Sequence, residues 1–378
     1  MTKVVIAGYA RSPFTLARKG ALMSARPDDL AAQVVQGLVD KTGVDPADIE
    51  DVIVGCAFPE GEQGFNIARM VALMADLPLS VGGVTVNRYC GSSMSAIHLA
   101  VGAICADAGE VFVCAGVESM TRVPMLGFNP MPNAAFAVRM PSAYMGMGET
   151  AENVATRWQV SRADQEVFAV ISQAKAAAAQ TAGKLAEEIV PVKVGSGEVA
   201  EDGCLRPSTS AQALAELKPA FSQHGTVTAG TSSPLTDGAS ATLICSENYA
   251  QANGLPIIAR IRSIAVAGCS PEVMGIGPVG ASQKALARAG LTSKDIDVTE
   301  LNEAFASQAL ACIRDLKLDP DKVNLDGGAL ALGHPLGATG ARITGKAAAL
   351  LKREGGEFAL ASQCIGGGQG IATVLESV

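Results

Sequence analysis

Short apolar strands alternate with amphipathic helices in two separate stretches of this chain. In the first stretch, residues 3–8 have the pattern of a buried strand, and residues 28–43 have the apolar spacing of a helix. Further strands and helices follow in the same order, as far as the strand EVFVCAGVE. This order predicts an α/β fold in which helices cover a parallel or mixed sheet.

The second stretch repeats this alternation from about residue 256. IIARIRSIAVAG has the pattern of an opening strand, and KALARAGL, ELNEAFASQALACIRDL and GARITGKAAALLKREGG continue with helices. EFALASQCIGGGQGIATVLES closes the chain with two predicted strands. We therefore expect two similar halves, one formed by residues 1–120 with about 235–257 and the other by residues 258–378.

Residues 121–234 interrupt the alternation and predict an inserted loop domain. Their first part, 121–148, is rich in Pro, Met, Gly and Asn, and long irregular segments in compact proteins are often functional. Two helices are expected after it, near 149–158 and 161–182. Ser161 is the candidate N-cap of the second, and Asp28 or Asp29 is the candidate N-cap of the helix over 28–43.

Composition excludes several classes of partner and cofactor. The formal net charge of −8 argues against nucleic acid and anionic membranes, and an anionic substrate would need local basic groups. No apolar stretch is long and uncharged enough to predict a membrane span, and the N-terminus has the pattern of a strand rather than a signal peptide. The nine cysteines form no CxxC pair, so we expect no metal centre and reduced thiols in a cytoplasmic protein.

Two cysteines stand at predicted strand ends beside glycines. Cys90, in NRYCGSSMSA, comes where a strand turns into a helix, and the positive end of a helix favours a thiolate. Gly91 to Ser93 are small enough to leave space for a substrate, although a buried structural cysteine suits this position equally well. Cys364, in CIGGGQG, precedes glycines whose backbone N–H groups could form an oxyanion hole.

One of the three histidines has the setting of a catalytic base. His334 is framed by glycine and proline in GGALALGHPLGATGAR, a rigid turn that could present an imidazole to a thiol. His98 falls inside an apolar helix and is expected to be packed there, and His224 is expected in a solvated loop.

Asn302 and Glu303 end a predicted strand, where functional polar groups gather in α/β folds, although a helix N-cap is the alternative. Two other motifs are expected to be false. GIGPVG fits a dinucleotide fingerprint but contains a proline, and GARITGKA lacks the Ser or Thr of a P-loop.

Taken together, the chain resembles the thiolase family almost end to end. The matching blocks are NRYCGSSMSA, AGVESM, MGETAENVA, LKPAF followed by GTVTAG, SSPLTDGA, NEAFA, GGALALGHPLGATGAR and CIGGGQG. The resemblance implies a five-layered α-β-α-β-α sandwich of two βαβαβαββ halves, with a CoA-binding loop domain inserted in the first. It also implies that CoA is a substrate and that no metal or redox cofactor is needed.

The resemblance assigns a role to each catalytic candidate. Cys90 would be the acylated nucleophile, His334 would activate it, and Cys364 would exchange the proton of the acetyl-CoA enolate. Asn302, through a water, and His334 would stabilise the enolate oxygen. The backbone N–H groups of Cys90 and Gly366 would hold the other oxyanion. Positions near CoA and the acyl chain match Arg206, Ser233, Met274 and Phe305.

The expected activity is that of a degradative 3-ketoacyl-CoA thiolase, an acetyl-CoA C-acyltransferase of fatty acid β-oxidation. Gly146 stands where biosynthetic acetoacetyl-CoA thiolases carry a histidine, and the loop before it is shorter than theirs. A homodimer is therefore favoured over a homotetramer, and some degradative enzymes bind a hydratase/dehydrogenase subunit. The alternatives are an acetyl-CoA C-acetyltransferase, a β-ketoacyl synthase, a nicotinamide oxidoreductase and a non-catalytic acyl-CoA-binding subunit.

Overall fold

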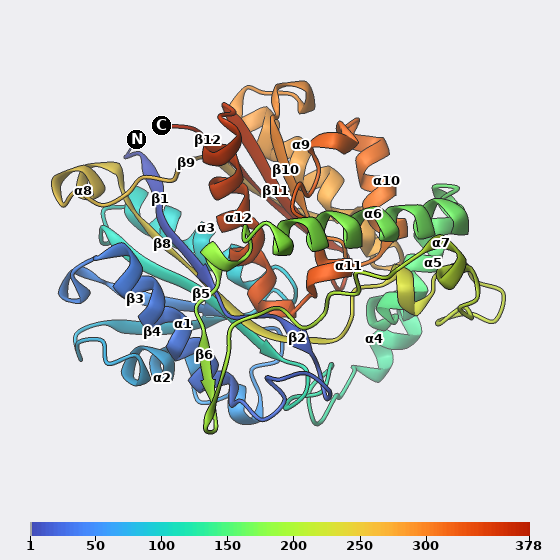
Figure 1. Ribbon diagram of the computed structural model, residues 1–378, viewed down its shortest axis with the longest axis horizontal. Helices are drawn as coiled ribbons and strands as arrows, with labels where there is room; N and C mark the ends of the chain where they lie inside the picture. Colours follow the sequence, from blue (N-terminus) through green and yellow to red (C-terminus); the bar gives the residue numbers. More distant parts are fainter. Residues whose placement is uncertain (1) are drawn as a thin grey trace.

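A computed structural model describes residues 2–378 as two packed halves and a peripheral loop region (Figure 1). The main sheet has the strand order β10-β11-β12-β9-β1-β8-β5-β3-β4, and the short strand β2 (Thr15–Leu16) pairs with β8. The two halves meet where β1 (Val4–Arg11) pairs antiparallel with β9 (Ala259–Gly268) at two positions. The expected α/β architecture is confirmed.

The N-terminal half follows the order βαβαβαββ. After β1, its elements are α1 (Pro27–Thr42), β3 (Asp51–Gly55), α2 (Ile67–Met74), β4 (Gly82–Val86), α3 (Ser92–Cys105), β5 (Val111–Ser119) and β8 (Thr236–Ser246). A short 3-10 helix, η2 (Gly61–Gln63), precedes α2, and α8 (Glu247–Ala252) leads to the second half. β4 forms one edge of the sheet.

The C-terminal half has the same strand order with one difference. After β9, its elements are η6 (Pro271–Ile276), α9 (Gly277–Ala289), β10 (Val298–Leu301), α10 (Ala306–Leu316), α11 (Ala329–Leu332), α12 (Thr339–Glu354), β11 (Phe358–Ile365) and β12 (Gln369–Glu376). The counterpart of β4 is reduced to one bridge between Thr299 and Val323. The third strand of the βαβαβαββ pattern is therefore represented in this half by a single parallel bridge.

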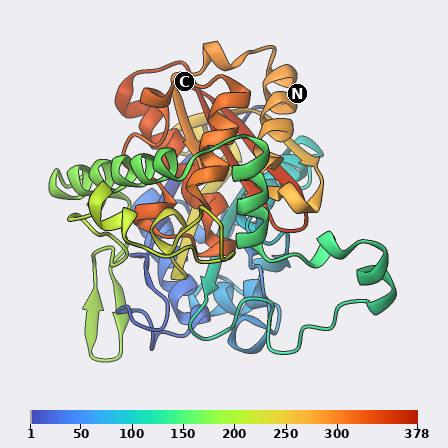
Figure 2. The same cartoon turned by 90° about the vertical axis from the view of Figure 1, so that its right-hand side faces the viewer.

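Five layers result from this arrangement (Figures 1 and 2). Helices α1 and α2 cover one face of the N-terminal strands, α9 and α10 cover the outer face of the C-terminal strands, and α3 packs against α12 between the two sets of strands. The central pair is close because it uses small residues. A Cβ on Gly340 would lie 2.3 Å from the backbone N of Met94, and the hydroxyl of Ser93 accepts from the N–H of Ala341 at 2.8 Å.

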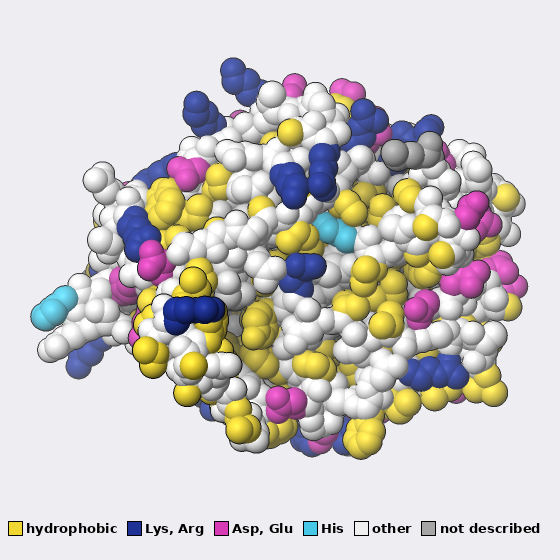
Figure 3. Space-filling model, turned by 180° about the vertical axis from the view of Figure 1, so that it is seen from behind, with side chains coloured by type: hydrophobic (Ala, Val, Ile, Leu, Met, Phe, Trp, Pro, Cys, Tyr) yellow, Lys and Arg dark blue, Asp and Glu magenta, His cyan; other side chains and the backbone are white. Residues whose placement is uncertain are grey.

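Residues 121–234 form the loop region beside this sandwich. Its elements are α4 (Ala134–Arg139), η3 (Pro141–Tyr144), α5 (Met147–Arg157), α6 (Arg162–Thr181), η4 (Ala186–Glu188), the hairpin β6 (Val192–Val194) and β7 (Gly197–Val199), α7 (Ala211–Ala215) and η5 (Ala229–Thr231). The segment that carries α4 extends away from the body as an arm (Figure 2). Seen from behind, apolar side chains gather over this arm (Figure 3).

Local signals at helix starts had mixed outcomes. Ser161 caps α6 as predicted, since its hydroxyl accepts from the N–H of Asp164. The predicted cap of α1 is wrong: Arg26 is the N-cap residue, without a side-chain cap bond, and Pro27 begins the helix ahead of Asp28 and Asp29. GARITGKA lies within α12 rather than in a phosphate loop, and Pro278 of GIGPVG lies in the first turn of α9. Within residues 2–378, no helix is long and apolar enough to span a membrane.

Candidate active site

Cys90 sits in a tight turn between β4 and α3. The residue before it, Tyr89, has a φ of 44°, which is strained for a non-glycine residue. The turn is closed by a hydrogen bond from the N–H of Gly91 to the carbonyl of Arg88 at 2.9 Å. The amide of Gln363 also donates to the carbonyl of Cys90 from the C-terminal half. The nucleophile candidate is thus fixed by residues far apart in sequence.

Burial controls the protonation of the Cys90 thiol. Its side chain packs against Ala57, Met120 and Leu336. Desolvation raises the pKa of Cys90 to about 11, although hydrogen bonds from backbone N–H groups, that of Gly366 included, oppose this shift. The expectation that the helix start would favour a thiolate is therefore wrong for the resting site. Cys90 is a thiol at neutral pH and needs a base.

The residues after Cys90 do not form a gap for substrate, contrary to expectation. Ser92 and Ser93 are fully buried, and a Cβ on Gly91 would come within 2.6 Å of the Ile365 side chain. Small residues are needed here because the start of α3 packs directly against the C-terminal half. Tyr89, on the other side of Cys90 in the chain, is exposed.

His334 is held in one orientation by its neighbours. Gly333, just before it, has a φ of 100°, and the N–H of His334 donates to the hydroxyl of Thr236 at 3.0 Å. The ring Nδ1 lies 2.6 Å from the hydroxyl of Thr339, which donates to the carbonyl of Pro335. This network assigns the proton to Nδ1 and leaves Nε2 as an acceptor.

The imidazole is neutral in the resting site. Burial, with a smaller contribution from the charge of Arg342, lowers the pKa of His334 to about 3. A neutral ring with an unprotonated Nε2 can accept a proton from a thiol, which is the role expected of a base for Cys90. Leu336, two residues after His334, packs in the same cluster as Cys90.

Asn302 and Cys364 come from the ends of neighbouring parallel strands, β10 and β11. The N–H of Asn302 donates to the carbonyl of Ser362 at 2.9 Å. The side-chain amide of Asn302 lies 3.4 Å from Nε2 of His334, and its Oδ1 is buried without a partner among residues 2–378. The alternative of a helix N-cap is wrong, because Phe305 occupies that position of α10. Asn302 instead presents a polar group beside the imidazole.

Cys364 is buried in an apolar cluster with two of the residues expected near substrate, Met274 and Phe305. Burial raises the pKa of Cys364 well above its ordinary value, and negative charge on Cys90 would raise it further. The thiol therefore holds its proton in the resting site. A Cβ on Gly366 would lie 3.4 Å from the sulfur of Met147, which packs on this cluster.

The other residues predicted to lie near substrate, Ser233 and Arg206, lie in the loop region. The N–H of Ser233 donates to the carbonyl of Ala304 at 3.0 Å, which places Ser233 beside the segment that carries Phe305. Arg206 is exposed in the loop region, and its backbone N–H donates to Gln173. His98 is packed as expected and contacts the hydroxyl of Thr373, and His224 is exposed. No group of three or more His, Cys, Asp or Glu suited to a metal occurs within residues 2–378.

The sequence did not mark Glu118 as a candidate, and it marked Glu303 as a functional rather than a supporting residue. The buried carboxylate of Glu118 accepts from the N–H groups of Ala57, Phe58 and Gly337, at 2.8, 3.2 and 2.9 Å. Glu118 thus joins the loop after β3 to the loop that carries His334. Its signal was its place in AGVESM, a charged residue inside an apolar strand.

Glu303 plays the same part beside Asn302. Its carboxylate accepts from the hydroxyl of Ser172 at 2.6 Å and from the side chain of Asn324 at 2.7 Å. Ser172 lies on α6, so this carboxylate joins the loop region to the C-terminal half. It follows Asn302 directly in the chain, where the strand-end pattern pointed to function rather than support.

Comparisons with known proteins agree with this geometry. Residues 4–248 match the family described as thiolase, N-terminal domain, and residues 255–377 match thiolase, C-terminal domain. The chain is 47% identical to a 3-ketoacyl-CoA thiolase of Bacillus subtilis (strain 168) and 48% identical to one of Shewanella sp. (strain ANA-3), over 100% of each chain. The crystal structure of human mitochondrial 3-ketoacyl-CoA thiolase in complex with CoA matches with a TM-score of 0.92 and 37% identity, over 100% of this chain and 98% of that one.

Proposed function

This chain belongs to the thiolase family, and we propose that it cleaves 3-ketoacyl-CoA with CoA to give acetyl-CoA and a shortened acyl-CoA. Two pairs of groups carry the proposal. The thiol of Cys90 is close enough to Cys364 for its charge to raise the pKa of that buried thiol. The carboxamide of Asn302 lies 3.4 Å from Nε2 of the neutral imidazole of His334. Full-length relatives named 3-ketoacyl-CoA thiolase support the same reaction.

In the first half-reaction, Nε2 of His334 takes the proton of Cys90 as the sulfur attacks the 3-keto carbon. The bond between C2 and C3 of the substrate then breaks, which leaves the acyl group on Cys90 and the enolate of acetyl-CoA. Cys364 gives its proton to the enolate carbon. A thiol with a raised pKa suits this step, because it stays protonated until a strongly basic carbanion forms beside it.

In the second half-reaction, CoA replaces acetyl-CoA, and the thiolate of Cys364 takes the proton of the incoming thiol. The CoA sulfur attacks the thioester on Cys90, and the released Cys90 sulfur recovers its proton from His334. The buried Oδ1 of Asn302 suits a water that hydrogen-bonds to the enolate oxygen. The N–H groups of Cys90 and Gly366 suit the other oxyanion.

The test is a thiolysis assay with 3-ketoacyl-CoAs of increasing chain length, followed through the absorbance of the Mg²⁺-enolate. Cys90→Ser should lower kcat by at least ~10³-fold, because an alkoxide is far harder to form than a thiolate. Cys105→Ser is the matched control, since Cys105 is an exposed thiol at the other end of the same helix. Full activity of Cys90→Ser would overturn the mechanism. Binding of acyl-CoA without turnover by the unmodified protein would favour the non-catalytic alternative.

Gly146 supports the degradative subtype and acyl chains beyond four carbons. It is the N-cap residue of α5, with an ordinary φ of −64°, directly before Met147 of the Cys364 cluster. A Cβ there would approach only Glu149, at 3.8 Å, so a larger side chain can be accommodated. We expect G146H to shift kcat/KM toward acetoacetyl-CoA and G146A to change it little. Strong preference of the unmodified enzyme for acetoacetyl-CoA would favour the biosynthetic alternative.

The loop region, residues 121–234, is the proposed CoA-binding part, with Arg206 and Ser233 as contacts. Arg206 is exposed and its guanidinium has no ion-pair partner among residues 2–378, so it can meet a phosphate of CoA. Arg206→Ala should raise KM for CoA by about 10-fold and leave the rate of Cys90 alkylation unchanged. An unchanged KM would remove Arg206 from the site.

A homodimer is the proposed assembly, supported by the edge strand β4 and its surroundings. Phe65, Leu79 and Val84 are 89%, 80% and 40% exposed, and an apolar edge strand invites another strand to pair with it. Phe128 of the exposed arm contacts Gly61 beside this patch. A second copy would cover both. Light scattering should give a dimer that Val84→Lys converts to a monomer, and a monomeric unmodified protein would overturn the assignment.

Within metabolism, we propose a role in fatty acid β-oxidation in the cytoplasm. All nine cysteines are free, which fits a reducing compartment. The steps that supply a 3-ketoacyl-CoA are hydration and oxidation of an unsaturated acyl-CoA, so a hydratase/dehydrogenase subunit is the proposed partner. Co-purification of the tagged protein from its own host tests this, and recovery of the homo-oligomer alone would contradict it.

A further inference from the structure

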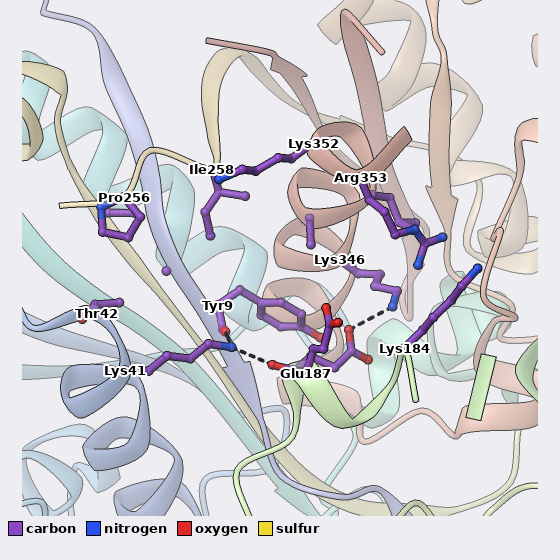
Figure 4. A pocket seen from close by; sticks show the side chains of 15 residues that line it. Tyr9, Lys41, Thr42, Lys184, Glu187, Pro256, Ile258, Lys346, Lys352 and Arg353 are labelled. Carbon is purple, nitrogen blue, oxygen red and sulfur yellow. Dashed lines mark hydrogen bonds and ion pairs between the residues drawn. The ribbon is translucent and has the colours of Figure 1, made fainter. Parts of the chain in front are cut away.

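A cavity of about 590 Å³ lies between the two halves and the loop region, apart from the catalytic residues (Figure 4). Its walls come from β1, the last turn of α1, residues 184–188, the segment before β9, and the second half of α12. This volume lies within the range of small-molecule sites. The cavity is at the end of α12 opposite to His334: Thr339 and Arg353 are separated by ~21 Å along the helix axis.

Basic side chains surround this cavity, and three of them are not used in ion pairs. Lys346 is paired with Glu188 and Asp326, and Arg353 is paired with Asp326. The exposed ammonium groups of the other three basic residues have no carboxylate partner within residues 2–378; they belong to Lys41, Lys184 and Lys352.

The acids of the wall do not cancel this charge. Glu188 is already bound by Arg11 and Lys346, which leaves Glu187 as the one lining carboxylate without an ion pair in the described chain. Three lysines and one glutamate of the lining are outside ion pairs in the described part of the chain, so these groups together give the cavity a net positive charge. The chain as a whole carries a formal charge of −8, so this concentration is local.

Helix ends account for part of this charge. Lys41 and Lys352 lie in the last turns of α1 and α12, where a cation is favoured by the helix dipole. That effect does not account for Lys184, which lies beyond the end of α6 at Thr181. The helix dipole also does not explain why the ammonium of Lys41 is held at the wall of the cavity. It is held there because it donates to the carbonyl of Glu187 at 2.7 Å.

The rest of the lining combines apolar surface with one unsatisfied hydroxyl. Pro256, Ile258 and Leu350 supply apolar wall, and Figure 4 labels Pro256 and Ile258 among the residues that line the cavity. The hydroxyl of Tyr9 is buried without a partner among residues 2–378. Burial, the largest of several causes, raises the pKa of Tyr9 well above its ordinary value, so the hydroxyl remains a hydrogen-bond donor.

We propose that this cavity binds a small phosphate-bearing molecule, with the phosphate groups held by Lys41, Lys184 and Lys352 and a compact organic body against Pro256 and Ile258. Lysine ammonium groups neutralise phosphate as point charges and need no fixed fork geometry. The site is separate from the catalytic cysteines and from the proposed CoA contacts, so its occupancy does not depend on the proposed function.

Isothermal titration tests the proposal with two probes, inorganic pyrophosphate and ADP, added to the whole protein already saturated with CoA. Saturation with CoA keeps either probe out of the proposed CoA site. One saturable site per chain is expected. The double variant K41A/K352A should raise Kd at least ~10-fold, because each lysine contributes a charge-assisted hydrogen bond. The matched control removes two exposed lysines elsewhere, K19A/K294A, and should leave Kd unchanged.

Comparison of the two probes separates recognition of the phosphates from recognition of the organic body. Tighter binding of ADP than of pyrophosphate supports a site for both the phosphates and an organic body, and equal binding supports recognition of the phosphates alone. No saturable binding of either probe overturns the proposal. So does an equal Kd for K41A/K352A and the unmodified protein, provided that both have the same Tm and the same thiolysis rate.

Discussion

The carboxyl ends of two parallel strand pairs, one in each half, carry different side chains at matching positions. In the N-terminal half, the pairing of β3 with β5 ends at Gly55 and Gly116, and Cys56 and Glu118 follow by one and two residues. In the C-terminal half, the pairing of β10 with β11 ends at Leu301 and Ser362. Asn302 comes one residue after Leu301, and Cys364 comes two residues after Ser362, as Cys56 and Glu118 do in the other half.

The two pairs differ in how far the protein itself satisfies them. Glu118 is surrounded by N–H donors, and Cys56 lies between Glu118 and the amide of Gln63. Asn302, by contrast, has an unpartnered Oδ1, and Cys364 faces apolar side chains. The same frame therefore supports the loops in one half and leaves groups free for chemistry in the other. Substitution at the four positions tests this division.

Cys364→Ala should have the largest effect. Loss of the acid that protonates the enolate should lower kcat for thiolysis by about 10³-fold, within the range of general acid–base catalysis. Alkylation of Cys90 by iodoacetamide should continue at the normal rate, because Cys364 is not the base for Cys90. Turnover within a few-fold of the unmodified enzyme would show that the matching position in the C-terminal half is not reserved for chemistry.

Asn302→Ala should come next, with kcat lower by about 10²-fold and KM little changed. The proposed role is to stabilise an oxyanion, and removal of one such donor costs roughly 10²–10³ in kcat. The side chain makes only a 3.4 Å contact with His334, so the free energy of unfolding should fall by about 1 kcal/mol or less. A large loss of stability with unchanged kcat would place Asn302 with the supporting residues instead.

Glu118→Gln should have an intermediate effect with a distinctive pH signature. Its carboxylate raises the pKa of Cys90 through charge, in addition to burial, which brings that pKa to about 11. The rate of iodoacetamide alkylation should therefore rise with pH toward about 11 in the unmodified enzyme and at lower pH in the variant. We expect kcat to fall by about 10-fold, because the loop of His334 loses a charge-assisted hydrogen bond of ~1.5–3 kcal/mol. An unmoved alkylation profile would reduce Glu118 to a packing role.

Cys56→Ala should have the smallest effect on catalysis. The thiol of Cys56 is buried and touches Glu118 and Gln63, so its removal should lower the free energy of unfolding in urea by about 1–2 kcal/mol. The value of kcat should stay within about 3-fold, because no step of the proposed reaction uses this thiol. A loss as large as that of Cys364→Ala would contradict the division between the halves.

The sequence alone determined the α/β class, the repeat of its strand and helix pattern, and the positions of the candidate reactive residues. These follow from local signals: strand and helix periodicity repeats along the chain, glycines frame His334, and cysteines stand at strand ends at Cys90 and Cys364. Such signals depend on residues close together in the chain, so they can be recognised without the fold. Even local signals can misplace a helix start. The helix α1 begins at Pro27, one residue ahead of the acidic residues that were expected to cap it.

Tertiary structure decided the chemical state of those residues. The sequence suggested a thiolate at Cys90, but desolvation of the sulfur in the folded protein raises its pKa to about 11. Packing between the halves closed the expected gap at Gly91 to Ser93 and joined Gln363 to the carbonyl of Cys90, 273 residues away in sequence. The pKa of one group depends on the burial and the charges produced by all of its neighbours, and folding brings those neighbours together from distant parts of the chain. The pattern around Cys90 could therefore mark the candidate site, while the protonation of its thiol depended on burial and on the charge of Glu118, which only the fold brings to it.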